Sequence, residues 1–498
     1  MKSFTKIAFL FGLFLMLLSS VPANVNINSE TSYKITIDAD NPRLAKIEAS
    51  FVLLDDLLYM NEHGAEQFQK RWANFVRNIS AKDVKGNLLT IEELPDAQWK
   101  VNAPANQKVN LSYEIVLKHD ESQWAGGIDG VAFARDWGVF YTGRTFLILN
   151  GKARDNIQVS FQIPDNWRVT APWNLYKNKP NVFLARNLTD LSESMFFAGT
   201  HEEFSVKRNG FELVFALGGV AAQKDSYKTL AQGVLDYYIK LMGGIPNPPP
   251  DSKFKKSVVI INAGKDLDGE VIGNHISMIL DPNGDQQAQL IAKFIFAHEF
   301  FHLWNGKSIN VAETTEDWFK EGVTNYYTLK ALQNIKAISE KDYFDTLNNL
   351  FYQRYKTDSG LGKSSMRDVA RGSEKDKHWG LIYGGGLFVG MCQDINIRKE
   401  TANQKSLDIL MRDLFKEYGG TNKTYTTADL QKSLTTLSGK DQTDFFRQYV
   451  FGIERVPIEK CLSSIGLKAQ IENGELRIGK KASANKSEDA MVSGILGN

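Results

Sequence analysis

Two histidines and a glutamate within five residues carry the strongest chemical signal in the sequence. They are His298, Glu299 and His302, and Glu321 follows after eighteen further residues. Residues four apart share one face of a helix, so both imidazoles can bind one zinc ion while Glu299 reaches a water beside it. Glu321 would be the third ligand. Because structural zinc sites are closed by four protein ligands, three ligands predict a catalytic site with one zinc ion per chain.

The chemistry expected of these residues is hydrolysis at a carbonyl carbon. Zinc lowers the pKa of bound water to about 7, which makes a nucleophile near neutral pH. Glu299 would accept the proton as the water attacks and pass it to the leaving amine. In the alternative reading, His298 and His302 only pack inside an apolar helix. That reading leaves the two well-spaced glutamates without an explanation.

A tyrosine further along the chain is the candidate for stabilising the oxyanion of the tetrahedral intermediate. Tyr383 can donate its hydroxyl proton, and three glycines follow it, which we expect to bring the backbone close to the cleft. Alternatively, Tyr383 is an ordinary aromatic residue at the glycine-rich start of a helix. Asn325, one turn after Glu321, could orient a histidine ligand. His378 is near Tyr383 in the sequence and stays without a role.

The segment before the histidine helix is the candidate for substrate binding. Gly273, Asn274 and His275 open an apolar run that reads as an edge strand, and Glu270 precedes it. An edge strand can pair with an extended peptide, which would place the substrate along this segment. His275 could face the cleft or could be polar surface, and we do not expect it to bind the metal.

The elements that must position these residues predict a multidomain α+β protein. Residues 30–218 are rich in alternating polar and apolar positions, which predicts an antiparallel, sandwich-like β domain that braces the catalytic domain and walls one side of the cleft. The runs that carry this pattern are 33–37, 111–117, 140–149 and 157–163.

A catalytic domain is expected over residues 219–335. Helical spacing over 226–242 is followed by strands over 258–262 and 273–280 and by the histidine helix over 286–304. Thr314 and Asp317 fit the ends of a capping box that would open the helix carrying Glu321.

The remainder of the chain is predicted to be helical up to residue 466. The candidate helices span 339–355, 378–398, 406–418, 427–437 and 441–451, and they form the C-terminal α-helical part of the catalytic region. Residues 467–498 are expected to be a partly disordered tail, because residues beyond about 480 are rich in Ala, Ser, Lys, Glu and Gly.

The N-terminal segment predicts export to the periplasm or the exterior. Lys2 and Lys6 precede an apolar run over 7–18 and a small-residue stretch, so residues 1–23 read as a cleaved signal peptide, with an uncleaved anchor as the alternative. Removing these lysines changes the formal charge from +1 to −1. The chain therefore lacks the basic block that nucleic-acid binding requires, and we expect no membrane span after signal cleavage. Cys392 and Cys461 either pair in an oxidising compartment or remain buried thiols.

The spacing His298-Glu299-x-x-His302 with Glu321 resembles that of the gluzincin metallopeptidases. Within that class, the flanking residues are similar to the glycyl aminopeptidase family. The resemblance implies zinc, hydrolysis of peptide bonds, and an N-terminal β domain before a thermolysin-like catalytic domain. It covers most of residues 30–466, and the stretches that carry it are 164–173, 298–305, 318–327 and 383–398.

Two departures from the family leave the type of peptidase open. Residues 271–277 lack the glutamate that family members commonly carry beside a histidine, although Glu270 could substitute as the anchor of a free amine. Members also often end in a PDZ-type domain, and the 31 residues after Leu467 are too few for one. We expect an aminopeptidase that acts on peptide or protein substrates. The alternatives are an endopeptidase of the same mechanism and a peptide-binding protein that does not cleave.

Overall fold

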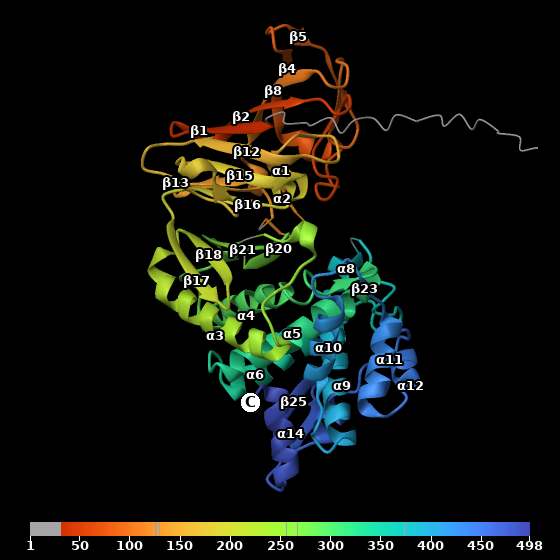
Figure 1. Ribbon diagram of the computed structural model, residues 1–498. Coiled ribbons are helices and arrows are strands. Elements are labelled where there is room, and N and C mark those ends of the chain that lie inside the picture. The colour runs from red at the N-terminus through yellow and green to blue at the C-terminus, as the bar shows by residue number, and fades with distance from the viewer. Residues whose placement is uncertain (1–30, 125–126, 129, 255, 266, 373) are drawn as a thin grey trace, which may run out of the picture.

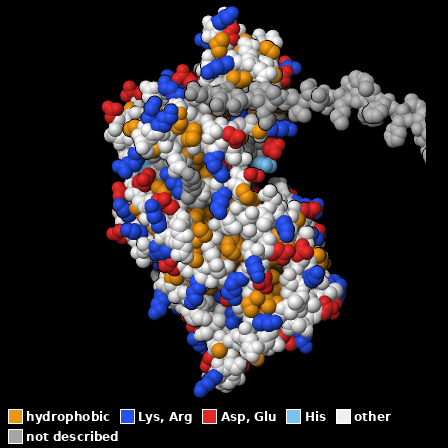
Figure 2. All heavy atoms as spheres, viewed as in Figure 1, with side chains coloured by type: hydrophobic (Ala, Val, Ile, Leu, Met, Phe, Trp, Pro, Cys, Tyr) orange, Lys and Arg blue, Asp and Glu red, His pale blue; other side chains and the backbone are white. Residues whose placement is uncertain are grey.

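The computed structural model describes residues 31–498 except 125–126, 129, 255, 266 and 373. The predicted signal peptide, residues 1–23, lies outside the described residues. The elements follow the chain in layers (Figure 1). Three β-sheets lie at one end, a five-stranded sheet crosses the middle, and helices fill the other end. Charged side chains of both signs are interspersed over the face shown in Figure 2.

The N-terminal region is built from three β-sheets, which confirms that this part of the chain is β-rich. The largest has eight strands in the order β14 (Asn174–Leu175), β15 (Val182–Asn187), β12 (Asp155–Gln162), β1 (Ser32–Asp38), β2 (Asn41–Val52), β8 (Lys108–Val116), β4 (Val76–Asp83) and β5 (Leu88–Leu89). The second runs β13 (Arg168–Thr170), β16 (Met195–Gly199), β10 (Gly138–Thr142) and β9 (Phe133–Arg135). The third runs β11 (Leu149–Asn150), β3 (Leu57–Tyr59), β7 (Gln98–Val101) and β6 (Ile91–Leu94).

Alternation along the strands explains how these sheets form a core. In β1 the side chains of Tyr33, Ile35 and Ile37 are buried while their neighbours face outward, as a strand with one buried face requires. The sheet is mixed rather than purely antiparallel, because β1 pairs parallel with β12. The single apolar run predicted over 140–149 is also divided, because the helical turn α1 (Gly143–Phe146) separates β10 from β11.

The middle sheet carries the next layer. Its order is β17 (Glu202–Arg208), β18 (Phe211–Gly218), β19 (Ser257–Ala263), β21 (His275–Leu280) and β20 (Asp268–Ile272). The domain boundary predicted at residue 218 would cut through this sheet, because β18, before the boundary, pairs parallel with β19, after it. The correction is that β17 and β18 share the sheet of the following region. Their alternation resembles that of the preceding strands, so local sequence could not tell to which sheet they belong.

Both faces of the middle sheet are covered. On one face Ile260, Ile272 and Ile279 join the core of the N-terminal sheets. On the other, Ile261 and Met278 join the helical core. This double burial accounts for the nearly continuous apolar run of β19.

The helical core packed on the middle sheet includes α3 (Lys224–Met242), α4 (Gln286–His302) and α5 (Asp317–Asn334). Helix α4 carries the two predicted histidine ligands, and α5 carries Glu321. The Asp285 side chain caps α4 by accepting a hydrogen bond from the backbone of Ala288. The predicted capping box of Thr314 and Asp317 does not form, because a 3-10 turn over Thr314–Glu316 precedes α5 and Asp317 pairs with lysines instead.

The helical prediction for the C-terminal part is confirmed with small shifts of the ends. The helix predicted over 378–398 begins after a turn at His378. It starts with a six-residue π segment over Gly380–Gly385. The segments are α6 (Glu340–Thr346), η7 (Leu347–Tyr352), α7 (Gln353–Thr357), α8 (Glu374–Lys377), η8 (Gly380–Gly385), α9 (Gly386–Glu400), α10 (Leu407–Tyr418), α11 (Thr427–Ser438), α12 (Thr443–Tyr449) and α13 (Ile458–Ser463).

The C-terminal segment is ordered, which corrects the prediction of a partly disordered tail. It forms β24 (Leu467–Glu472), β25 (Glu475–Lys480) and α14 (Lys486–Leu496). Met491, Val492, Ile495 and Leu496 are buried, and α14 packs on α5 and α9. The polar composition concealed an amphipathic spacing and a capping box that begins at Asn485.

A disulfide joins the helices α9 and α13. Cys392 and Cys461 are bonded, with their Cα atoms 5.5 Å apart, which answers the question that the sequence left open. In the part of the chain that the structure describes, no helix combines the length and the apolarity needed to span a membrane.

Candidate active site

The three predicted ligands come together where α4 meets α5. Glu321 Oε2 lies 3.5 Å from His298 Nε2 and 3.2 Å from His302 Nε2. The two histidine Nε2 atoms are 3.0 Å apart. The three side chains are buried, with exposed fractions of 8%, 9% and 6% for His298, His302 and Glu321. Helical spacing places the histidines on one face of α4, and the packing of α5 on α4 brings the glutamate to them.

This arrangement fits a zinc ion. Metal–ligand bonds of 2.0–2.1 Å in a tetrahedron place ligand atoms about 3.3 Å apart, close to the three distances found. His302 Nδ1 donates a hydrogen bond to the backbone oxygen of Asn305 at 2.9 Å, so its Nε2 lone pair can face the carboxylate. Two lone pairs directed at each other repel unless a cation lies between them. Burial lowers the pKa of His298 to about 4, which keeps it in the neutral form that binds metal.

The second oxygen of Glu321 is held by two lysines that sequence reasoning missed. Lys375 Nζ donates to Glu321 Oε1 at 2.8 Å and to Asp317 Oδ2 at 2.7 Å. Lys320 Nζ lies 3.4 Å from the same glutamate oxygen and 2.8 Å from Asp317 Oδ1. Burial by itself would raise the pKa of Glu321, but Lys375, His302 and Lys320 hold it well below its usual range. The Glu321 carboxylate is therefore ionised, and its free oxygen faces the histidines.

Glu299 lies at the same end of α4 in a buried environment. Its Oε1 is 4.0 Å from His298 Nε2, and the side chain is 6% exposed. Burial raises the pKa of Glu299 to about 8, and the negative charge of Glu321 adds to the rise. Such a carboxylate has a high affinity for a proton, which suits a general base. A cation held by the three ligands would oppose this rise.

Tyr383 lies on η8 beside the lysine that holds Glu321. Lys375 Nζ is 5.4 Å from the centre of its ring, and the Trp379 ring stacks on Tyr383 with the ring centres 4.9 Å apart. Burial, together with the charge of Glu321, raises the pKa of Tyr383, so its hydroxyl stays protonated and able to donate.

The glycines after Tyr383 serve helix packing, which corrects the expectation that they open onto the cleft. A Cβ atom on Gly386 would lie 2.0 Å from the backbone oxygen of Trp318 on α5. A Cβ on Gly322 would lie 2.3 Å from the backbone of Gly386. The close crossing of α5 and α9 therefore requires glycine on both helices.

Asn325 bridges these elements. Its Nδ2 donates to the backbone oxygen of Tyr383 at 3.2 Å, and its side chain favours the protonated form of His298. Asn325 thus lies between His298 and the tyrosine segment, and its orienting role stays a prediction.

The predicted substrate segment is placed differently from the expectation. Strand β21 is internal, because β19 and β20 pair with its two sides, so the edge strand is β20. His275 is fully buried and its Nδ1 accepts a hydrogen bond from the backbone of Val258, while Asn274 donates to the backbone oxygen of Ser252. Gly273 occupies the turn with φ of +55°. Apolar runs of this kind are compatible with an edge or an internal strand, and pairing decides between them.

Glu270 is the candidate that lies on the edge strand. It follows Gly269, where a Cβ atom would lie 2.9 Å from Glu299 Cγ. The negative charge of Glu270 contributes to the raised pKa of Glu299, and burial raises the pKa of Glu270 itself. The structure thus places β20 directly against the predicted base.

The N-terminal region contributes charged side chains near Glu270 that the sequence did not indicate. Arg144 Nε donates to Glu193 Oε1 at 3.1 Å, and a second bond joins the same side chains. The positive charges of Arg144 and Lys307 lower the pKa of Glu270, although burial outweighs them. Lys307 follows the histidine helix, and burial lowers its pKa to about 8.

Comparisons with known proteins agree with this site. Residues 70–200 match the peptidase M61 N-terminal domain, and residues 292–383 match the M61 glycyl aminopeptidase. No curated protein sequence matches the chain. The second match contains the two histidines and Glu321.

Solved structures share the fold. An aminopeptidase N family protein from Idiomarina loihiensis superposes with a TM-score of 0.75 at 17% identity, over 89% of this chain and 79% of that one. A variant of the M1 zinc metallopeptidase from Deinococcus radiodurans gives a TM-score of 0.54 at 12% identity, over 86% and 95%. The same variant with a Tyr-Ser-Ala substrate gives 0.52 at 12% identity, over 86% and 95%. At these identities the likeness concerns the fold. With the two family matches and the His-His-Glu cluster, the chain is a gluzincin-type zinc metallopeptidase that resembles the M61 glycyl aminopeptidases.

Proposed function

We propose that this protein is an aminopeptidase with a thermolysin-like catalytic domain, with one zinc ion held by His298, His302 and Glu321. The observation that favours an aminopeptidase is Glu270 on the edge strand β20, next to the glycine that contacts Glu299. A peptide added along β20 would extend the sheet, and a carboxylate on that strand, whose charge influences the predicted base, can bind the free amine of the first residue.

The protein side chains would divide the chemistry among them. A zinc ion at this site supplies Lewis acidity and lowers the pKa of water toward about 7. Glu299 accepts the proton of the attacking water and delivers it to the leaving amine. Tyr383 donates a hydrogen bond to the oxygen that becomes negative at the scissile carbonyl. Burial of the cluster strengthens each of these interactions.

An endopeptidase of the same mechanism is the second candidate, and one observation favours it. Arg144 and Lys307 place positive charge near Glu270, which weakens the attraction of that carboxylate for a free amine. An endopeptidase needs no amine anchor. The two candidates share Glu299 and the metal ligands and differ only in the role of Glu270.

We also propose that the protein is exported to the periplasm or the exterior. The disulfide between Cys392 and Cys461 supports this, because disulfides persist in oxidising compartments. Peptide mass fingerprinting of the purified native protein would test the proposal. Export predicts a mature N-terminus near residue 24, whereas a protein that begins at Met1 in the cytosolic fraction would contradict it.

A mixed peptide pool separates the two peptidase readings. Half of the peptides carry free N-termini and half carry acetylated ones, and mass spectrometry identifies the products of the zinc-loaded protein. An aminopeptidase removes single residues from free N-termini only, and Glu270→Gln then raises KM for these peptides. Internal cuts that ignore acetylation would establish the endopeptidase. Glu299→Gln protein controls for contaminating peptidases, and a pool left intact by the zinc-loaded native protein would indicate a binding protein that does not cleave.

A further inference from the structure

Hydrolysis by itself does not explain why the second carboxylate oxygen of Glu321 is paired with lysines. A metal ligand needs one carboxylate oxygen, and Oε2 faces the histidines. The other oxygen, Oε1, accepts from Lys375 at 2.8 Å. The Lys375 side chain is only 19% exposed, and a cation so shielded from water destabilises the fold unless its charge is paired. Lys375 is paired twice, since Asp317 Oδ2 also lies 2.7 Å from its Nζ. Lys375 therefore fixes which oxygen of Glu321 is free.

The same lysine contacts the predicted oxyanion donor. Its Nζ lies 5.4 Å from the ring centre of Tyr383 and interacts with the hydroxyl group. Trp379 stacks on Tyr383 with an interplanar angle of 5°, and the Arg354 guanidinium covers Trp379 at 4.6 Å. The Tyr383 ring is thereby in contact with both a cation and an aromatic ring, which together hold its orientation.

The sequence spacing explains how one lysine can reach both groups. Lys375, Trp379 and Tyr383 are four residues apart, so they share one face of the helical stretch that runs from α8 into η8. The face they share lies against the N-terminal half of α5, which carries Asp317 and Glu321. The π segment that contains Tyr383 fits this position, since such segments are common at functional sites.

We propose that Lys375 is a positioning residue that couples the metal ligand Glu321 to Tyr383. It holds Oε1 so that Oε2 binds the metal, and it sets the place of the Tyr383 hydroxyl relative to that metal. Loss of Lys375 then weakens metal binding and also slows turnover in the zinc-saturated enzyme. This inference rests on the roles of Glu321 and Tyr383 given under the proposed function.

Metal affinity gives a readout that is independent of activity. Competition with a chelator of known zinc affinity is measured for the native protein and for Lys375→Met, whose side chain keeps the apolar stem. We expect a loss of affinity of about 10–100-fold, the range found when residues that orient metal ligands are replaced. Lys375→Gln retains a hydrogen-bond donor and should lose less, and it replaces the methionine variant if that variant fails to fold. Zinc affinity within twofold of the native value in both variants would overturn the proposal.

Lys320→Met is the matched control, because Lys320 contacts the same oxygen of Glu321 at 3.4 Å from α5 itself. The coupling to Tyr383 is tested by a double-mutant cycle on kcat at saturating zinc. Lys375→Met should reduce kcat severalfold in the native background and hardly at all in Tyr383→Phe. Lys320→Met should have the same effect on kcat in both backgrounds. Equal effects of Lys375→Met in both backgrounds would overturn the coupling.

The two proposals fail in different ways. If Tyr383→Phe retains native kcat, the oxyanion role under the proposed function is wrong. If Tyr383→Phe lowers kcat but replacing Lys375 leaves zinc affinity unchanged, the peptidase mechanism stands and the positioning role of Lys375 is wrong.

Discussion

Helix α5 carries two buried charged clusters that differ in how completely their charges are paired. The site cluster contains Glu321 with the two histidines and Glu299. The inner cluster lies nine residues further along, about 13 Å at 1.5 Å per residue, and is centred on Lys330. Lys330 Nζ pairs with Asp408 Oδ1 at 3.0 Å and lies 3.5 Å from Asp394 Oδ2.

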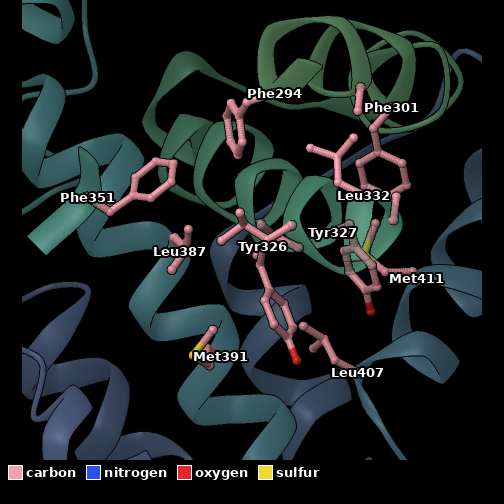
Figure 3. Packing of buried hydrophobic residues seen from close by; sticks show 14 of the residues in the cluster. Phe294, Phe301, Tyr326, Tyr327, Leu332, Phe351, Leu387, Met391, Leu407 and Met411 are labelled. Atoms are coloured by element: carbon pink, nitrogen blue, oxygen red, sulfur yellow. The ribbon is translucent and has the colours of Figure 1, made fainter. Parts of the chain in front are cut away.

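Nearly every polar atom of the inner cluster has a protein partner. Asp394 accepts from the Tyr326 hydroxyl at 2.6 Å, from Arg398 at 3.1 Å and from the backbone of Leu407 at 2.8 Å. In Figure 3 the hydroxyl groups of Tyr326 and Tyr327 point away from Phe294 and Phe301. The inner cluster ties α5 to α9 and α10.

In the site cluster, the two histidines and Glu299 have few protein partners and can bind a proton or a cation. The two Nε2 atoms face each other at 3.0 Å, and burial raises the pKa of Glu299 to about 8. Buried charges that are fully paired stabilise the fold. Buried groups without partners lower the free energy of unfolding but remain able to bind a proton or a metal ion. The comparison predicts that substitutions in the two clusters have opposite consequences for activity and stability.

The largest effect is expected from Glu299→Gln. Without a general base, kcat should fall about 10²–10⁴-fold, while zinc binding persists because Glu299 is not among the three grouped ligands. Turnover of a peptide by the zinc-loaded variant and its metal content by mass spectrometry check this. Activity within tenfold of the native protein would remove Glu299 from the base role.

Asp394→Ala should do the reverse. It leaves Lys330 and Arg398 buried with one partner fewer, and breaking a buried pair costs about 3–5 kcal/mol of the free energy of unfolding. Urea unfolding gives this value, and zinc affinity should stay native. Lys341→Ala, which breaks the exposed pair of Lys341 with Asp345, is the control and should leave the free energy of unfolding nearly unchanged. A loss of zinc affinity in Asp394→Ala would show that the clusters are not independent.

The free energy of unfolding should depend on pH through Glu299 of the site cluster. The folded pKa of Glu299, about 8, lies above its ordinary value of 4.5, so the folded state binds the proton more tightly than the unfolded state. In zinc-free protein the carboxylate therefore destabilises the fold progressively as the pH rises from 4.5 to 8, by up to about 3 kcal/mol near pH 7. Glu299→Gln should abolish this slope. Urea unfolding of both zinc-free proteins across that window measures it, and parallel curves would contradict the expectation.

The sequence predicted the site cluster better than the inner cluster or the boundaries. His298, Glu299 and His302 are close in the sequence, so the geometry of one helix groups them, and the spacing to Glu321 is that of the family that the sequence resembles. Lys330, Asp394 and Asp408 are distant in sequence and carry no motif.

Other misses have the same physical origin. Which strand forms the edge of the middle sheet depends on pairing between strands, and the apolar run of β21 does not contain that information. The buried face of α14 was hidden by its polar composition, and it could have been found from the spacing of Met491, Val492, Ile495 and Leu496.

The smallest effect is expected from Asn325→Ala, which lies on α5 between the clusters. Asn325 donates to the backbone oxygen of Tyr383 at 3.2 Å and interacts with His298, so its loss should lower zinc affinity about tenfold. Thr328→Val is the control, because the Thr328 hydroxyl donates to the backbone oxygen of Thr324 within α5 and is not among the groups that contact His298 or Tyr383 in the described residues. Chelator competition measures both variants. Since α5 is the rigid element common to both clusters, an equal loss of zinc affinity in the two variants would mean that any perturbation of α5 reaches the metal site, and the distinction between the clusters would then not hold.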